Sequence, residues 1–148
     1  QAGWVGTVGL MWLLPGPLDA QLQRDSGLTL FEYMVMSRLS MSERLAMRMS
    51  ELAAVTASRP SRLSNVVGRL EKRGWVSRRP DPCDGRGTVA TLTDDGLELV
   101  RRAAPGHVEA VRRYVVDRLT PAQLHSLAEI GEVVTQAVRG DCVEHPEG

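Results

Sequence analysis

The sequence predicts a mainly helical fold that contains one small β-hairpin. Apolar residues recur at helical spacing along most of the 148-residue chain. Two capping-box sequences, Thr29 to Glu32 and Thr120 to Gln123, mark helix starts because their outer side chains can satisfy each other's backbone amides. A Pro/Asp/Gly cluster at residues 80–87 separates two short β-prone segments, which is typical of a hairpin.

The first element is an apolar helix over residues 4–25, broken or bent at Pro15-Gly16-Pro17 because proline removes a helix hydrogen bond. Its longest apolar run, residues 8–14, is much shorter than the roughly 18 residues of a membrane span, so no membrane association is expected. The helix that starts at Thr29 is expected to bury one face, made of Phe31, Met34, Val35 and Leu39.

A polar, loop-like segment at residues 40–44 leads to a short helix that Ser50 is expected to cap, with Leu52, Ala53 and Val55 on it. The next helix begins near Ser58 or Arg59, and Gly74 ends it. Its inward face is predicted to be Leu63, Val66, Val67 and Leu70. Its opposite face is polar and basic, and consists of Ser61, Arg62, Ser64, Asn65 and Arg69. Two helices joined by a tight turn, the second basic on its outer face, indicate a helix-turn-helix.

Residues 75–79 and 87–92 are predicted to pair as the hairpin, and Thr93 then caps a long helix. The predicted apolar stripe of that helix is Leu97, Val100, Ala104, Val108, Val111, Val115 and Leu119. Pro105-Gly106 is expected to kink it. A last helix runs from Thr120 through about Val138, with its apolar face on Leu124, Leu127, Ile130, Val134 and Val138.

The charge of the chain is zero overall but is distributed unevenly. Eight basic residues stand against three acidic ones between Thr56 and Arg86, a net charge of +5 that leaves −5 for the remainder. A basic block of this kind is the usual footprint of a polyanion-binding face, and a solvated helix face is the alternative.

Other functional classes find little support in the sequence. No nucleophile, base and orienting residue have positions that suggest convergence, and no phosphate-binding glycine loop is present, so we expect neither an enzyme nor a cofactor. Cys83 and Cys142 are too few for a disulfide framework and favour free thiols, although a single bridge stays open as an alternative. Cys142 and His145 have metal-ligand spacing, but two ligands do not complete a zinc site.

Helix, helix, basic helix and an arginine-tipped hairpin are the layout of a winged helix-turn-helix. In that layout the basic recognition helix occupies the major groove of double-stranded DNA, and the hairpin, or wing, carries an arginine into the minor groove. Arg86 is the predicted arginine of the wing, and Asp84 is expected to hold its guanidinium in a fixed pose. The surrounding basic block adds Arg59, Arg78 and Arg79 to the candidate DNA-binding residues.

These residues resemble the MarR (multiple antibiotic resistance regulator) transcription factors. The resemblance rests on three motifs. Residues 61–78 contain L-E-x-x-G at positions 70–74, followed by a strand. The wing motif D-x-R stands at Asp84 to Arg86, and L-T-x-x-G stands at residues 92–96. It implies that Ser61, Arg62, Ser64, Asn65 and Arg69 face DNA and that Asp84 and Arg86 form the wing contact. The chain departs from the family at Gly85, where many relatives carry another arginine.

The resemblance further implies a homodimer built by the terminal helices. The expected organisation is residues 1–28 for an N-terminal dimerisation helix, 29–96 for the DNA-binding domain, 97–140 for C-terminal dimerisation helices and 141–148 for a tail. The long apolar stripes support this independently, because uncovered they would form a large exposed patch. A twofold dimer reads a pseudo-palindrome, and we expect a cytoplasmic repressor.

A small phenolic or lipophilic effector is also implied by the family. Trp12, Met36 and His107 are the candidate residues for its binding pocket. The runner-up function is a winged-helix protein-interaction module whose basic face docks an acidic partner, since winged helices do not always bind DNA.

Overall fold

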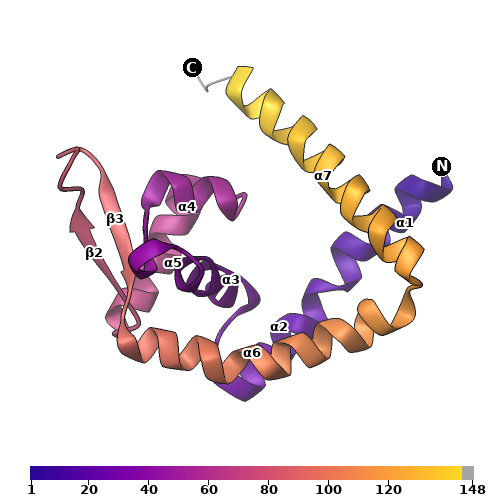
Figure 1. Ribbon diagram of the computed structural model, residues 1–148, viewed down its shortest axis with the longest axis horizontal. Helices are drawn as coiled ribbons and strands as arrows, with labels where there is room; N and C mark the ends of the chain where they lie inside the picture. The colour runs from indigo at the N-terminus through magenta and orange to yellow at the C-terminus, as the bar shows by residue number, and fades with distance from the viewer. Residues whose placement is uncertain (145–148) are drawn as a thin grey trace. The chain divides into compact units, whose positions relative to one another are not determined.

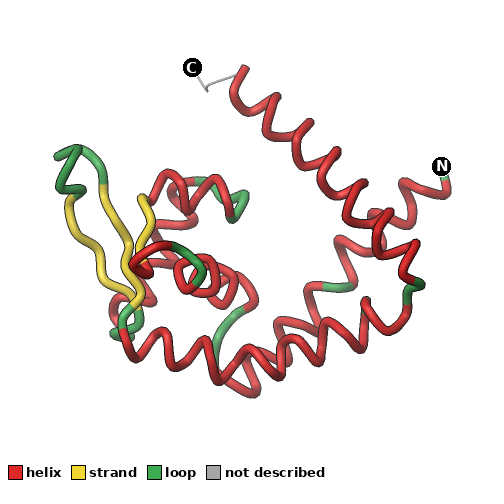
Figure 2. The backbone as a smooth tube through the Cα atoms, viewed as in Figure 1, coloured by secondary structure: helices red, strands yellow, loops and turns green. Residues whose placement is uncertain are grey.

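The computed structural model describes the backbone of residues 1–144 and the side chains of residues 1–138. The helices are α1 (Ala2–Leu13), α2 (Pro15–Ser26), α3 (Leu30–Ser40), α4 (Met49–Val55), α5 (Pro60–Lys72), α6 (Asp94–Tyr114) and α7 (Pro121–Glu144). The strands are β1 (Ala46–Arg48), β2 (Val76–Pro80) and β3 (Thr88–Leu92), and single 3₁₀ turns lie at Glu43–Leu45 and Val116–Arg118. The mainly helical fold with a small hairpin is therefore confirmed (Figures 1 and 2).

The chain divides into two compact units, residues 1–110 and residues 111–148. The first unit holds α1 to α5, the three strands and most of α6. The second unit holds the end of α6 and, beyond it, α7. All of the candidate DNA-binding residues belong to the first unit.

The break predicted in the first helix is confirmed at Pro15. Leu14 keeps a helical backbone, and Pro15 then starts α2 at the position where a missing amide hydrogen costs nothing. Gly27, with φ of 68°, ends α2 in the left-handed conformation that glycine adopts at low cost. In α1 no residue is buried, whereas α2 buries Leu18, Gln21 and Leu22.

The capping box at the start of α3 is confirmed, but the predicted buried face is only partly right. Thr29 Oγ1 accepts from the Glu32 amide at 3.1 Å, and Glu32 Oε2 accepts from the Thr29 amide at 3.0 Å. Val35 and Leu39 are buried as expected, but Met34 is 39% exposed and Tyr33 and Met36 are buried in its place. The reason is that α3 packs against α2, α4, α5 and the sheet, so its burial is not confined to one stripe.

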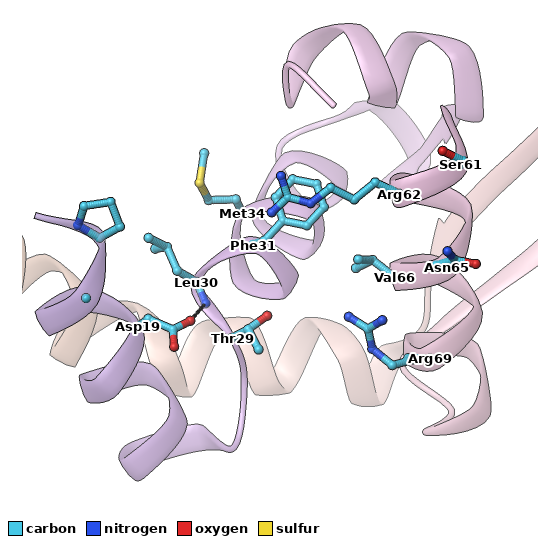
Figure 3. Close-up of a pocket in the computed structure, with 12 residues that line it drawn as sticks. Asp19, Thr29, Leu30, Phe31, Met34, Ser61, Arg62, Asn65, Val66 and Arg69 are labelled. Atoms are coloured by element: carbon cyan, nitrogen blue, oxygen red, sulfur yellow. Dashed lines mark hydrogen bonds between the residues drawn. The ribbon is translucent and has the colours of Figure 1, made fainter. Parts of the chain in front are cut away.

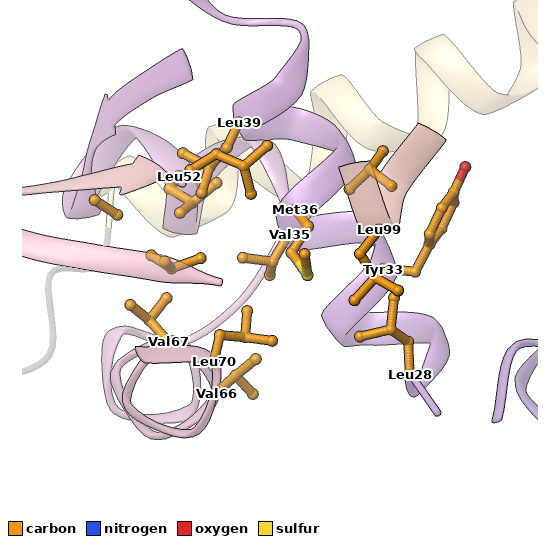
Figure 4. Close-up of a cluster of buried hydrophobic side chains, with 14 of the residues drawn as sticks. Leu28, Tyr33, Val35, Met36, Leu39, Leu52, Val66, Val67, Leu70 and Leu99 are labelled. Atoms are coloured by element: carbon orange, nitrogen blue, oxygen red, sulfur yellow. The ribbon is translucent and has the colours of Figure 1, made fainter. Parts of the chain in front are cut away.

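The core of the first unit lies where α3 and α5 meet the sheet, as Figure 4 shows. Its largest fully buried side chains are Leu22, Leu28, Met36, Leu39, Leu52, Leu63 and Leu70. All four residues of the predicted inward face of α5 are buried there, at Leu63, Val66, Val67 and Leu70. This packing fixes which face of α5 points outward.

Two details before α5 differ from the sequence prediction. Ser50 does not cap α4, because α4 begins at Met49 with Arg48 as its N-cap and no side-chain cap bond. Residues 46–48, which carried no strand prediction, form β1 and lead directly into α4. A strand of three residues is too short to show an alternating pattern in sequence.

The predicted hairpin of β2 and β3 is confirmed, and β1 extends it to a three-stranded antiparallel sheet of order β1-β3-β2. Val76 pairs with Leu92, Arg78 with Ala90, and Pro80 with Thr88. Alternate residues of β3, Ala90 and Leu92, are buried. The buried root anchors the hairpin to the core, and the exposed tip extends beyond it.

Helix α6 begins as predicted, with the Gly96 amide donating to Thr93 Oγ1 at 3.1 Å, and runs without a break through Pro105. Its buried residues are Gly96, Leu99, Val100 and Ala103 rather than the whole predicted stripe, and Val108 is 54% exposed. Thr120 and Gln123 form the predicted capping box of α7, whose residues Leu127, Ile130, Val134 and Val138 are exposed. Across the described residues, no helix is long and apolar enough to cross a membrane.

Candidate nucleic-acid interface

The outward face of α5 carries the polar and basic residues that the sequence assigned to it. Four buried aliphatic residues hold the opposite face against the core, so the side chains between them point to solvent. Ser61, Arg62, Ser64, Asn65 and Arg69 are all exposed. The structure thus brings these five predicted residues together on one helix face.

Two arginines of this face contact α3. The Arg62 guanidinium lies 4.2 Å from the centre of the Phe31 ring, and Figure 3 shows it stacked over that ring. Arg69 Nε lies 3.4 Å from Glu32 Oε1, and the Glu32 side chain is only 5% exposed. These two contacts were not predicted from the sequence, because their partners are 31 and 37 residues away along the chain.

Arg78 has an intramolecular partner. Its Nε and Nη2 donate to Glu71 Oε2 at 3.0 and 2.9 Å, and its backbone amide donates to Glu71 Oε1 at 3.1 Å. These hydrogen bonds lower the pKa of the Glu71 carboxyl below its ordinary value. Because Arg78 Nη1 also donates to Ser64 Oγ at 3.4 Å, the residue joins β2 to the outward face of α5.

At the wing tip, Asp84 does not hold the Arg86 guanidinium as expected. Asp84 Oδ1 instead accepts from the backbone amide of Arg86 at 3.1 Å, so the carboxylate orders the turn and leaves the guanidinium free. Arg86 is exposed, as are Arg79 of β2 and Arg59 before α5. Among the described residues, none of these three arginines forms an ion pair.

Asp81 is the residue of the wing that the sequence prediction missed. It is 6% exposed, and its Oδ2 lies 2.6 Å from Arg48 Nε, an ion-pair contact outside hydrogen-bond geometry. Its Oδ1 accepts from the Cys83 amide at 2.8 Å, and its own amide donates to the Gly87 carbonyl at 2.9 Å. An aspartate that bonds the amide two residues later is a recognised turn pattern, so the D-P-C sequence carried a usable signal.

The wing and α5 border one hollow of about 390 Å³. Pro60 and Ser64 of α5 line one side, and Asp84, Arg86 and Gly87 of the wing line the other. The arginine of the wing therefore lies beside the outward face of α5 rather than on the opposite side of the molecule.

A larger open cavity of about 940 Å³ lies between α2, α3 and α5 (Figure 3). Its apolar lining includes Leu30, Phe31, Met34 and Val66, and its cationic lining is Arg62 and Arg69. Apolar walls with a few convergent polar groups are typical of small-molecule sites.

None of the three predicted pocket residues lines this cavity. Trp12 is 81% exposed on α1, and Met36 is fully buried in the core. His107 is half-buried against Tyr33, with the ring centres 4.6 Å apart, and this burial lowers its pKa. Met34, which the sequence placed in the core, is the methionine that faces the cavity.

Metal binding finds no site in the described part of the chain. There, no group of three or more His, Cys, Asp or Glu side chains is arranged to hold an ion. Cys142 and His145 lie outside the residues whose side chains are described. Cys83 is an exposed free thiol in the wing.

Comparison with known proteins identifies relatives over most of the chain. The MarR family model matches residues 26–87. A transcriptional repressor of Mycobacterium tuberculosis, Rv2887, is 37% identical over 97 residues, which are 66% of this chain and 68% of that protein.

Two solved structures from Streptomyces coelicolor match more of the chain. Sco3205, a MarR family regulator in complex with DNA, has a TM-score of 0.89 and 48% identity over 93% of this chain and 86% of that one. AbsC, a regulator of the same family, has a TM-score of 0.89 and 38% identity over 95% of this chain and 94% of that one.

Proposed function

Since the chain belongs to the MarR family and is a DNA-binding transcriptional regulator, we propose that it acts as a homodimeric repressor on a pseudo-palindromic operator. Each protomer places α5 in the major groove, where Arg62 and Asn65 are suited to bases and Ser61, Ser64 and Arg69 to bases or phosphates. The wing places Arg86 in the adjacent minor groove. Arg59 and Arg79 contact the phosphate backbone beside them.

The single observation that carries this proposal is the shared hollow between α5 and the wing. Ser64 of α5 and Arg86 of the wing both border this hollow, so the helix and the wing tip face the same side. Neighbouring major and minor grooves of a duplex require this arrangement. The related Sco3205 was solved in complex with DNA, which supports DNA as the partner here.

Exposed apolar side chains on the terminal helices support the dimer. In the first unit, α1 exposes Trp4, Val5, Leu10, Met11, Trp12 and Leu13. In the second unit, α7 exposes Leu127, Ile130, Val133, Val134 and Val138. Surfaces of this kind usually mark interfaces, and a second copy of the chain covers them in this proposal. A twofold dimer sets the half-sites about one helical turn, roughly 34 Å, apart.

The cavity beside α5 supports regulation by a small phenolic or lipophilic effector. Leu30, Phe31 and Met34 offer an apolar surface, and Arg62 and Arg69 offer charge to a polar group. These arginines are also candidate DNA contacts. An effector that binds the DNA-free protein more tightly than the DNA-bound protein therefore lowers the affinity for DNA. The protein works in the cytoplasm in this proposal, without a cofactor or an enzymatic activity.

Titration against a random-sequence duplex at low salt tests the proposal against its runner-up. A DNA-binding face with several free arginines binds any duplex through its phosphates. The logarithm of the affinity then falls linearly with the logarithm of the salt concentration. A winged-helix module that docks an acidic protein predicts no appreciable binding even at low salt. Absence of binding with folded protein would therefore reject the DNA assignment in favour of that module.

A further inference from the structure

We propose that Phe31 and Glu32, consecutive residues in the first turn of α3, are positioning residues that hold Arg62 and Arg69 of α5 in the pose that reads DNA. The inference rests on the proposed DNA-binding function. It assigns a role in DNA selectivity to two residues that do not lie on the DNA-facing surface themselves.

Glu32 is fixed before it meets Arg69. Its Oε2 accepts from the Thr29 amide at 3.0 Å, and its own amide donates to Thr29 Oγ1 at 3.1 Å, so the carboxylate has one orientation. The remaining oxygen, Oε1, lies 3.4 Å from Arg69 Nε. Because the Glu32 side chain is 5% exposed and that of Arg69 is 55% exposed, the contact anchors Nε and leaves the end of the guanidinium accessible.

Phe31 performs the same task by a different interaction. Its ring is half-buried and packs against the core cluster, so it is a fixed platform. The Arg62 guanidinium lies 4.2 Å from the ring centre, which is a cation–π distance. In this arrangement one side of the guanidinium plane is occupied, while its edge, which carries the hydrogen-bond donors, is free to meet a base.

The two contacts act on the same helix face. Arg62 and Arg69 are seven residues apart, about two helical turns, and therefore project from the same side of α5. The first turn of α3 is in turn tied to α2, because the Leu30 amide donates to Asp19 Oδ1 at 2.7 Å (Figure 3). Two long side chains are thus ordered before DNA arrives, which lowers the entropy lost on binding.

The variant Phe31→Leu/Glu32→Gln removes the ring and the charge while keeping similar volumes. We first select a preferred duplex with the wild-type protein, and then titrate both proteins with it and with a random duplex of the same length. Each contact is worth about threefold, so affinity for the selected duplex should fall about tenfold for each protomer of the bound dimer. Affinity for the random duplex should change by less than about twofold, because phosphate contacts tolerate loose arginines.

The same double substitution in an Arg62→Ala/Arg69→Ala background separates positioning from a general effect on the fold. With no arginines to position, it should change the affinity for the selected duplex by less than about twofold. Phe31→Tyr with Glu32 retained keeps the ring face and the carboxylate, and should show wild-type selectivity. Glu98→Gln on α6 controls for the loss of one negative charge. If the double variant fails to fold by circular dichroism, Glu32→Gln alone is used, with an expected loss of about threefold for each protomer of the bound dimer.

Three results would overturn the inference. Equal losses on the selected and random duplexes would show that selectivity does not depend on these residues. A loss of the same size that persists in the Arg62→Ala/Arg69→Ala background would show that they act through the fold. A gain in affinity would show that α3 restrains the arginines from DNA. Failure of the wild-type protein to bind any duplex would instead reject the proposed function, and the inference with it.

Discussion

At the scale of single residues, the six candidate DNA-binding arginines fall into two groups. Arg62, Arg69 and Arg78 have intramolecular partners at the surface of α5. Arg59, Arg79 and Arg86 are exposed without an ion pair among the described residues. Base readout requires a fixed donor geometry, whereas phosphate and minor-groove contacts need only charge and reach. The partners therefore suggest which arginines read sequence and which supply sequence-independent affinity.

The first prediction concerns Arg86, whose guanidinium is free at the wing tip. Replacement by alanine should weaken binding to all duplexes and reduce the slope of log affinity against log salt by about 2, because a bound homodimer loses one counterion-displacing cation from each wing. Fluorescence polarisation over a salt series measures the slope. Arg101→Ala, which removes an exposed arginine of α6, is the control and should leave it unchanged. An unchanged slope in Arg86→Ala would mean that the wing does not touch DNA.

The second prediction concerns His107, whose burial lowers its pKa from the ordinary value of 6.5. Its Nδ1 is buried without a hydrogen-bond partner among the described residues. The unfolded chain then takes up a proton at a higher pH than the folded chain does. Stability that is fully present above pH 6.5 is therefore lost as the pH falls through the lower folded-state pKa.

Thermal unfolding of wild type and His107→Gln between pH 7.5 and 5 checks this, because these limits lie about one unit or more on either side of the ordinary histidine pKa of 6.5. The melting temperature of the wild-type protein should fall more steeply with acid than that of the variant. Parallel pH profiles would show that His107 does not titrate differently in the two states.

At the scale of elements, the sequence was most informative where local signals and packing agree. The capping boxes at Thr29 and Thr120 and the buried face of α5 were all predictable, because each depends on residues a few positions apart. The hairpin followed from its turn residues in the same way.

The misses share a physical cause, which is contact between distant segments. The stripe predicted for α6 shifted to Leu99 and Ala103 because the first unit buries only the start of that helix. Met34, which was predicted to be buried in the core, lines the cavity instead, because α3 is packed on several sides and other residues of the helix fill the core. In the candidate site, the positions on α5 were predictable, whereas the partners Phe31, Glu32 and Glu71 depend on how α5 meets α3 and β2.

The third prediction tests the junction between the hairpin and α6. A Cβ added at Gly96 would lie 2.2 Å from the Trp75 carbonyl oxygen, which is backbone and cannot move aside cheaply. Gly96→Ala should therefore reduce the free energy of unfolding by about 3 kcal/mol or more, as overpacking against a rigid neighbour does. Denaturant unfolding gives the value.

Gly68→Ala in α5 is the matched control, because its added Cβ would meet only Arg78 Nη2 at an ordinary 3.6 Å. That substitution should stabilise the protein by up to about 1 kcal/mol through helix propensity. Equal effects of the two substitutions would contradict the close approach at Gly96.

At the scale of the whole molecule, the proposed DNA-reading surface and the proposed dimer interface differ in their exposed apolar residues. The outward face of α5 is polar and basic, whereas α1 and α7 are apolar where they meet solvent. The exposed ring of Trp12 contributes no burial energy in an isolated chain. In the proposed dimer, removing that ring from water would stabilise the assembly.

The fourth prediction follows for Trp12→Glu. Because Trp12 is 81% exposed, the change should leave the fold of one chain intact while placing a charge in the proposed interface. Sedimentation equilibrium should show self-association weakened about tenfold or more, since burying an unpaired charge costs over 1 kcal/mol. Lys72→Glu, an exposed charge reversal on α5, should not change the association. A monomeric wild-type protein would contradict the proposed dimer.

The most direct test of the central claim is selection of bound duplexes from a random pool by wild type and by Arg62→Ala. If a dimer reads DNA with α5, the wild-type protein should enrich a pseudo-palindrome with half-sites about one helical turn apart. The variant should lose preference at one symmetric pair of positions, at a cost of about 1 to 3 kcal/mol per contact. Enrichment of no motif, or of the same motif by both proteins, would contradict base reading by the outward face of α5.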